Sequence, residues 1–155
     1  MNQGAPVTIT KRFTLEMAHA LRGYDGPCAH IHGHSYILDV SLQGIPLNEP
    51  SATKDGMVMD FGDLRTIVKA CVLDHYDHAL VLHEHESEGI PTGHALFSRT
   101  RFTRWQPTCE NLLLDMVQRI GRHLPNTVKL HQVRLQETAT SWAEWKAPMD
   151  ALPIP

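Results

Sequence analysis

Two segments near the N-terminus alternate apolar and polar residues with the period of two that is typical of a half-buried strand. The first covers residues 8–19, and its apolar side carries Phe13, Leu15, Met17 and His19. The second covers about residues 30–42, and its apolar side carries His32, His34, Tyr36, Leu38, Val40 and Leu42. Both predicted strands therefore place histidines among apolar side chains.

Two later segments repeat apolar residues at helical spacing. The first begins after Asp60 as its expected N-cap, ends near residues 73–78, and has a stripe made of Leu64, Ile67, Val68, Cys71 and Val72. The second begins after Thr108 as its N-cap, ends before Pro125, and has a stripe made of Leu113, Met116, Val117, Ile120 and Leu124. Because cysteine packs as a small hydrophobic residue, we expect Cys71 to be buried and inert.

A last strand is predicted over residues 127–138, with a change of phase inside it. One face carries Val133, Leu135 and Glu137, and a bulge near His131 or Gln132 brings the earlier Val128 and Leu130 into phase with them. Residues 83–105 show no sustained period, so we expect a long loop or lid with room for a short hairpin. The order strand, strand, helix, helix, strand predicts an α+β fold with an antiparallel sheet.

Length and charge narrow the functional classes. A chain of 155 residues suits one domain spanning residues 1–155. The net charge is −3 and no run of lysines or arginines occurs, so we expect no nucleic acid partner. No stretch approaches the roughly 18 to 20 apolar residues of a membrane span, and the N-terminus lacks an apolar signal core. We therefore expect no membrane association and a cytoplasmic location, where the three cysteines would stay reduced.

Histidine is the unusual residue, with 11 copies scattered along the chain. Three imidazoles on one sheet face, from His19, His32 and His34, match the protein ligands of a catalytic zinc site whose fourth position is open. His30 has the same parity, and spacing alone does not exclude it from the site. The pattern therefore predicts a zinc site at the ends of the first two strands.

Other candidate residues stand near these histidines. Cys28, four residues before His32, is a candidate reactive thiol; the alternatives are an inert thiol or a fourth ligand that would close the metal site. The end of the first helix offers two carboxylate–imidazole pairs, Asp74 with His75 and Asp77 with His78, as candidate proton-transfer groups. The residue pattern does not choose between these pairs, and both could equally be solvated helix-end residues.

Glu137 is predicted on an apolar strand face, where an unpaired carboxylate is costly. Two kinds of donor would satisfy it. A heterocycle with two parallel N–H groups, such as guanine or a pterin, would engage both oxygens. An arginine such as Arg134 or Arg101 would serve as well, and the sequence leaves these alternatives open.

These residues lie in six motifs, which follow one another in the order FTLEMAH, CAHIHGHSY, GMVMDFGDL, LDHYD, PTCEN and QET. This ordered set resembles the 6-pyruvoyl tetrahydropterin synthase family, which includes the bacterial 6-carboxytetrahydropterin synthases. The motifs cover most of the chain outside residues 83–105. HGH alone would be a weak signal, but the ordered set is specific.

The resemblance implies roles for particular residues. It implies that zinc is held by His19, His32 and His34. It implies that the catalytic residues are Cys28, Asp74 and His75. It implies that the pterin is bound by Glu137, Thr108 and Glu110. His30 and the pair Asp77–His78 are then left without a role.

The resemblance also implies the tunnelling fold, an α+β fold whose antiparallel sheet carries two helices on one face and assembles into an oligomeric barrel. The expected oligomer is a homohexamer of two trimers with active sites between subunits. The implied substrate is 7,8-dihydroneopterin triphosphate.

Within the family, the three residues between Cys28 and HGH resemble the branch that forms 6-carboxy-5,6,7,8-tetrahydropterin for queuosine, with release of triphosphate and acetaldehyde. The other outcome is the 6-pyruvoyl product of the biopterin branch. Cys28 itself argues against a variant branch that carries glutamate there and feeds folate synthesis.

Two departures from the family pattern bear on the pocket. Residues 83–105 form an insertion between LDHYD and PTCEN, and residues 79–82 read ALVL where relatives often carry an asparagine. HEHE at residues 83–86 is a candidate second metal site, although a solvated loop explains it better. The arginines of the insertion are candidate phosphate contacts, although a solvated charged loop again explains them better: Arg99, Arg101 and Arg104.

Two other functional classes fit part of the pattern. A non-catalytic zinc- and pterin-binding module would also hold the three histidines, but it would tolerate loss of Cys28 or His75. A hydrolase with a zinc-bound water and Glu110 or Glu137 as base would leave Cys28 without a role.

Overall fold

The computed structural model describes residues 4–91 and 93–148; residues 1–3, 92 and 149–155 of the predicted single domain lie outside the described part. Its strands are β1 (Val7–His19), β2 (His32–Gly44), β3 (Ala79–His83), β4 (Thr100–Thr103), β5 (Lys129–Thr138) and β6 (Ser141–Lys146). Its main helices are α1 (Phe61–Val68), α2 (Asp74–Tyr76) and α3 (Cys109–His123), and a π-helical turn, Lys69–Leu73, joins α1 to α2. The strands form one sheet in the order β4-β3-β1-β2-β5-β6.

The sheet is mixed, which corrects the predicted antiparallel sheet. The pairs β1–β2, β2–β5 and β5–β6 are antiparallel, as expected. The pairs β1–β3 and β3–β4 are parallel, because the chain crosses over through α1 and α2 before it joins the far edge of β1. The α+β class itself is confirmed.

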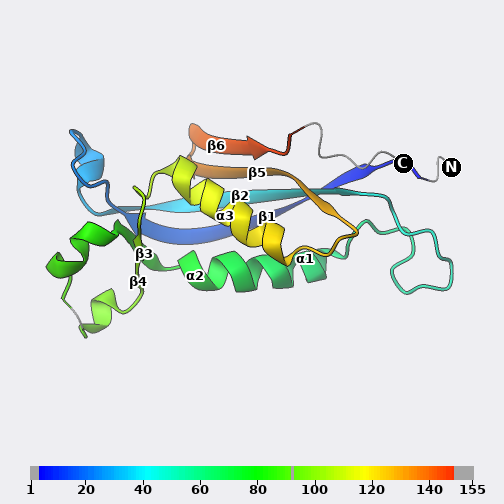
Figure 1. Ribbon diagram of the computed structural model, residues 1–155, viewed down its shortest axis with the longest axis horizontal. Coiled ribbons are helices and arrows are strands. Elements are labelled where there is room, and N and C mark those ends of the chain that lie inside the picture. Colours follow the sequence, from blue (N-terminus) through cyan, green and yellow to red (C-terminus); the bar gives the residue numbers. More distant parts are fainter. Residues whose placement is uncertain (1–3, 92, 149–155) are drawn as a thin grey trace.

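Both helical segments cover the same face of the sheet, as predicted (Figure 1). Alternate residues of the long strands point into the core under the helices, including Leu15, Tyr36, Leu38, Val40 and Leu135, all at most 1% exposed. The helices contribute the other half of this core through Leu64, Val68, Leu112, Met116 and Ile120. The histidine-bearing ends of β1 and β2 continue this covered face.

Local features of the helices agree with the sequence. Asp60 caps α1 by accepting a hydrogen bond from the Gly62 amide at 2.6 Å, and Thr108 caps α3 by accepting one from the Asn111 amide at 3.3 Å. The helix that starts at Phe61 continues through the π-helical turn to Tyr76, close to the predicted end. Cys71 is 8% exposed and packs in the core, as predicted.

The predicted bulge in the last strand is also confirmed. Ser41 pairs with Gln132 and the next residue, Leu42, pairs with Leu130, so His131 is the extra residue. The bulge returns Leu130 and Val128 to the face of Val133. Glu137 therefore lies on the covered face of the sheet, at the same end as the histidines.

Three short strands were not predicted, and the predicted long loop is partly regular. β3 is a short apolar run that periodicity does not separate from a helix end, and β6 lies near the end of the described chain. Within residues 83–105 the chain forms 3₁₀ turns at Glu84–Gly89 and Ala95–Phe97 and then β4. Because β4 runs parallel to β3, the expected hairpin is absent from the described part of this segment.

β2 begins at His32 and not at His30, which instead follows a 3₁₀ turn at Pro27–Ala29. No helix in the described residues has the length and apolar character needed to cross a membrane.

Candidate functional site

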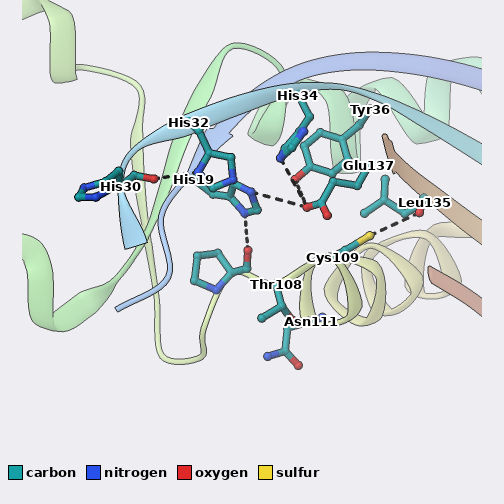
Figure 2. Close-up of polar contacts among 11 residues, drawn as sticks. His19, His30, His32, His34, Tyr36, Thr108, Cys109, Asn111, Leu135 and Glu137 are labelled. Carbon is teal, nitrogen blue, oxygen red and sulfur yellow. Dashed lines mark hydrogen bonds and ion pairs between the residues drawn. The ribbon is translucent and has the colours of Figure 1, made fainter. Parts of the chain in front are cut away.

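Three histidines converge where β1 ends and β2 begins (Figure 2). His19 is the last residue of β1 and pairs across the sheet with His32, the first residue of β2. His34 lies two residues further on the same face. One nitrogen from each ring lies within 4.8 Å of the others, so the trio can share one metal ion.

Backbone carbonyls fix the orientation of two of these rings. The His19 Nδ1–H group donates to the Pro107 carbonyl at 2.6 Å, and the His32 Nδ1–H group donates to the His30 carbonyl at 2.8 Å. Each bond sets the tautomer, so that the Nε2 atom keeps its lone pair for a metal. His30 thus supports the site through its backbone, while its side chain is exposed.

The surroundings of His19 show whether the site fits a metal. Its side chain is 3% exposed, and its Nε2 atom has no hydrogen-bond partner. Burial lowers the pKa of His19, so the imidazole is neutral at ordinary pH even though its Nδ1 bond to Pro107 acts in the other direction. A buried nitrogen without a partner costs free energy. The orphaned nitrogen and the all-imidazole donor set fit a transition metal such as zinc.

Glu137 stands beside the histidines at the end of β5. Its Oε1 atom lies 3.6 Å from Nε2 of His19 and 3.8 Å from Nε2 of His34, and it accepts a hydrogen bond from the Tyr36 hydroxyl at 3.0 Å. Burial, and next the Glu137 carboxylate, raise the pKa of Tyr36, so this hydroxyl stays a donor. Among the described contacts, Oε2 of Glu137 has no partner and is available to a ligand.

Neither arginine considered as a partner for Glu137 has a described hydrogen bond or ion pair with it. The Arg134 guanidinium stacks over the Trp142 ring, 4.1 Å from its centre. The Arg101 Nε–H group donates to the His75 carbonyl at 3.1 Å. The structure therefore leaves the alternative in which Glu137 receives N–H groups from a ligand.

The start of α3 forms the neighbouring wall of the site. Thr108 follows Pro107, whose carbonyl holds His19, while Glu110 is exposed in the first turn of α3 and makes no described contact with the histidines. Cys109, in the same turn, lies beside β5, where its thiol donates to the Leu135 carbonyl at 3.4 Å. Burial, followed by the Glu137 carboxylate, raises the pKa of this thiol to about 11. Tyr36 and Cys109 were missed as site residues; the parity of Tyr36 with His34 could have revealed it.

Cys28 lies on the 3₁₀ turn just before β2 and is half-buried. Its sulfur is close enough to Tyr36 to contribute to the raised pKa of that phenol. The thiol makes no hydrogen bond within the described residues. Cys28 therefore lies near Tyr36 and is not one of the three clustered ligands.

Asp74 and His75 do not form a contact pair. The Asp74 carboxylate receives a hydrogen bond from Lys69 at 2.5 Å. His75 Nε2 accepts instead from Arg119 at 3.3 Å, and burial, followed by the charges of Arg119 and Arg101, lowers the pKa of His75. Both residues line a depression of about 370 Å³ that does not include the three histidines.

Asp77 and His78 do form a contact pair. His78 Nδ1 lies 3.1 Å from Asp77 Oδ1, and the same carboxylate oxygen accepts the backbone N–H of Glu16 at 2.8 Å. His78 has a φ of 60°, uncommon for a side-chain-bearing residue, and its own N–H donates to the Glu16 carbonyl at 2.6 Å. Its ring is 71% exposed. No hydrogen bond or ion pair joins His78 or His75 to the three histidines within the described part of the chain, although His78 and His34 line one shallow hollow.

Comparison with known proteins identifies the family of this chain. The family model described as 6-pyruvoyl tetrahydropterin synthase matches residues 8–148. The chain belongs to the 6-pyruvoyl tetrahydropterin synthase family. As a member of this family, the chain is an enzyme, a lyase of the tetrahydropterin synthase kind.

Relatives in the family extend over nearly the whole chain. A 6-carboxy-5,6,7,8-tetrahydropterin synthase from Haemophilus influenzae is 36% identical over 141 residues, which are 89% of this chain and 97% of the relative. A protein of the same name from Rickettsia bellii is 28% identical over 144 residues, 89% of this chain and 99% of the relative.

Solved structures confirm the family fold. An uncharacterized protein from Wolinella succinogenes superimposes with a TM-score of 0.74 at 19% identity, covering 94% of this chain and all of that one. The 6-pyruvoyl tetrahydropterin synthase of Caenorhabditis elegans superimposes with a TM-score of 0.66 at 23% identity, covering 96% of this chain and all of that one. At these identities the likeness shows the fold of the family.

Proposed function

We propose that this lyase converts 7,8-dihydroneopterin triphosphate and water to 6-carboxy-5,6,7,8-tetrahydropterin, with release of triphosphate and acetaldehyde. The observation that carries the proposal is the set of three converging imidazoles beside the Glu137 carboxylate. The relatives named 6-carboxy-5,6,7,8-tetrahydropterin synthase, which match almost end to end, support this branch of the family.

The metal in this proposal is zinc, held by His19, His32 and His34. When bound, it would act as a Lewis acid that acidifies the hydroxyls of the substrate side chain. The hydrogen bonds from His19 and His32 to backbone carbonyls hold the two rings in the orientation that a metal requires.

Glu137 is the proposed anchor of the pterin ring. Tyr36 holds one carboxylate oxygen in place, and the other oxygen is available for an N–H group of the heterocycle. A pterin presents two parallel N–H groups, and a carboxylate that accepts both gains orientation as well as binding energy. Thr108 and Glu110, at the start of α3, complete the proposed pterin pocket.

Proton transfer is assigned to Cys28 and a carboxylate–imidazole pair. The family resemblance assigns this role to Asp74 and His75, and that assignment stays a prediction. The contacts within one chain instead favour Asp77–His78, because Asp77 orients the His78 ring directly and the ring is largely exposed. Nε2 of His75, in contrast, is already occupied by Arg119. An oriented imidazole with a free nitrogen is the arrangement that general acid–base catalysis needs.

No described hydrogen bond or ion pair joins either pair to the three histidines within one chain, so we propose that a neighbouring copy supplies the imidazole. This agrees with a homo-oligomer, a hexamer of two trimers, in which each active site lies between subunits. The exposed position of His78 leaves it accessible to such a neighbour.

The test is turnover by the purified protein loaded with zinc. The protein is incubated with 7,8-dihydroneopterin triphosphate, and the products are identified by mass. We expect 6-carboxytetrahydropterin and acetaldehyde, and neither from Cys28→Ala. A 6-pyruvoyl product would move the protein to the biopterin branch, and an unchanged substrate in the presence of bound zinc would overturn the proposed substrate.

A further inference from the structure

The segment that carries Cys28 is a loop between two metal-site histidines. This Cys28 loop, residues 20–31, leaves β1 directly after His19 and enters β2 at His32. A hydrogen bond of 2.8 Å from the Leu21 amide to the Cys28 carbonyl closes its base. The only regular structure in the loop is the 3₁₀ turn at Pro27–Ala29, so contacts from outside must fix its position.

One side chain from a distant part of the sequence supplies such contacts. The Gln106 Oε1 atom accepts the Arg22 N–H at 3.1 Å, and the Gln106 Nε2 group donates to the Arg22 carbonyl. Gln106 therefore satisfies both backbone groups of Arg22, the residue next to Leu21. A glutamine amide that binds one residue's N–H and C=O together fixes the position and the orientation of that peptide.

Gln106 is itself held rigidly beside the metal ligands. Its carbonyl accepts the Thr108 N–H at 2.8 Å and the Asn111 side-chain amide at 3.0 Å, which ties it to the first turn of α3. The next residue, Pro107, accepts the Nδ1–H group of His19 at 2.6 Å. The contacts therefore run from a metal-site histidine through Pro107 and Gln106 to the loop that bears Cys28.

The inserted segment, residues 83–105, also contacts Arg22. The Arg22 guanidinium lies 3.0 Å from Glu86, in the 3₁₀ turn at Glu84–Gly89. Both side chains are largely exposed, at 52% and 44%, so this ion pair adds little by itself. The amide contacts of Gln106 are the principal restraint.

We propose that Gln106 is a positioning residue that holds the Cys28 thiol in register with the three histidines. The proposal rests on the catalytic role proposed for Cys28. A displacement of about 1 Å in a reacting group can lower a rate by about 100-fold, so a loop that moves freely would leave the thiol present but misplaced.

The test replaces Gln106 by methionine, which keeps the length of the side chain and removes both hydrogen bonds. The matched control is Gln118→Met, at an exposed glutamine of α3. For Gln106→Met we expect kcat to fall about 10- to 100-fold with KM within about 2-fold of the parent. Gln106→Glu keeps the acceptor for the Arg22 N–H and loses the donor, so its kcat should lie between those of the parent and Gln106→Met.

Two readouts do not depend on turnover. Alkylation of Cys28 by iodoacetamide, located by mass spectrometry, should become several-fold faster in Gln106→Met because the loop opens; Cys71, at 8% exposure, serves as the internal reference. The visible spectrum of the cobalt-substituted protein reports the three histidines and should not change.

These readouts separate the possible failures. Unchanged alkylation in both Gln106 variants would overturn the positioning role, whether or not the protein turns over the proposed substrate. An altered cobalt spectrum would overturn it too, because Gln106 would then act through His19 and not through Cys28. Faster alkylation without turnover in the parent protein would support the positioning role and refute the proposed substrate.

Discussion

At the scale of single residues, the histidines around β2 differ in what their side chains do. His34→Ala removes one of the three clustered nitrogens, whereas His30→Ala removes an exposed ring and keeps the carbonyl that holds His32. Loss of an outer-shell partner costs about 10- to 100-fold in metal affinity, so we expect His34→Ala to cost more than that. Zinc competition titration would measure both variants, and equal losses would contradict this division of roles.

His75 gives the pH dependence of stability a definite sign. Burial, then Arg119 and Arg101, lower the pKa of His75 below 6.5, with Asp115 acting in the opposite direction and Arg99 in the same one. The unfolded chain therefore binds a proton near pH 6.5 while the folded chain does not. The stability that neutral His75 contributes is present above pH 6.5, and it is lost as the pH falls through the lowered pKa of His75 in the folded chain.

Urea unfolding between pH 5 and about pH 7.5 measures this effect. We expect the parent protein to lose stability on acidification and His75→Gln to lose less. The exposed His30→Gln serves as the control and should follow the parent. A parallel course for parent and His75→Gln would show that His75 does not titrate differently in the folded state.

At the scale of elements, the start of α3 links fold and site. Thr108 caps this helix, and the same short segment supplies Pro107 for His19 and Gln106 for the Cys28 loop. Thr108→Ala should lower the free energy of unfolding by about 1 kcal/mol, because the Asn111 N–H loses its acceptor. Thr108→Ser keeps the oxygen and should lose less. Urea unfolding at neutral pH distinguishes them, and equal stability of all three proteins would contradict the capping role.

At the scale of the whole molecule, the separation of the candidate groups makes a prediction about assembly. If one copy supplies Cys28 and its neighbour supplies His78, then Cys28→Ala and His78→Gln should each be inactive alone. After joint refolding in equal amounts, about one quarter of the sites would combine two intact partners, so about one quarter of the parent activity should return. A site built within one chain would give no recovery.

The same mixture with His75→Gln in place of His78→Gln decides between the two carboxylate–imidazole pairs. We expect His75→Gln to be active without mixing, because Nε2 of His75 is engaged by Arg119. An inactive His75→Gln that regains activity with Cys28→Ala would instead assign proton transfer to Asp74–His75.

The sequence by itself determined the features that depend on local periodicity. Alternation placed His19, His32 and His34 on the covered face, helical spacing located α1 and α3 with their caps, and the change of phase in β5 required the bulge at His131. Each of these follows from residues a few positions apart, whose side-chain directions are set by the regular backbone.

Only the tertiary structure decided the contacts between distant segments. The parallel pairing of β3 with β1, the Tyr36–Glu137 hydrogen bond and the Gln106–Arg22 contacts join residues that no local pattern relates. Spacing alone left His30 in competition with the three histidines, and the coordinates separate its side chain from their cluster. The contact of Asp77 with His78 also needed coordinates, because Asp74 and His75 have the same offset. Packing decides such choices, because it fixes which of several equally spaced side chains meet.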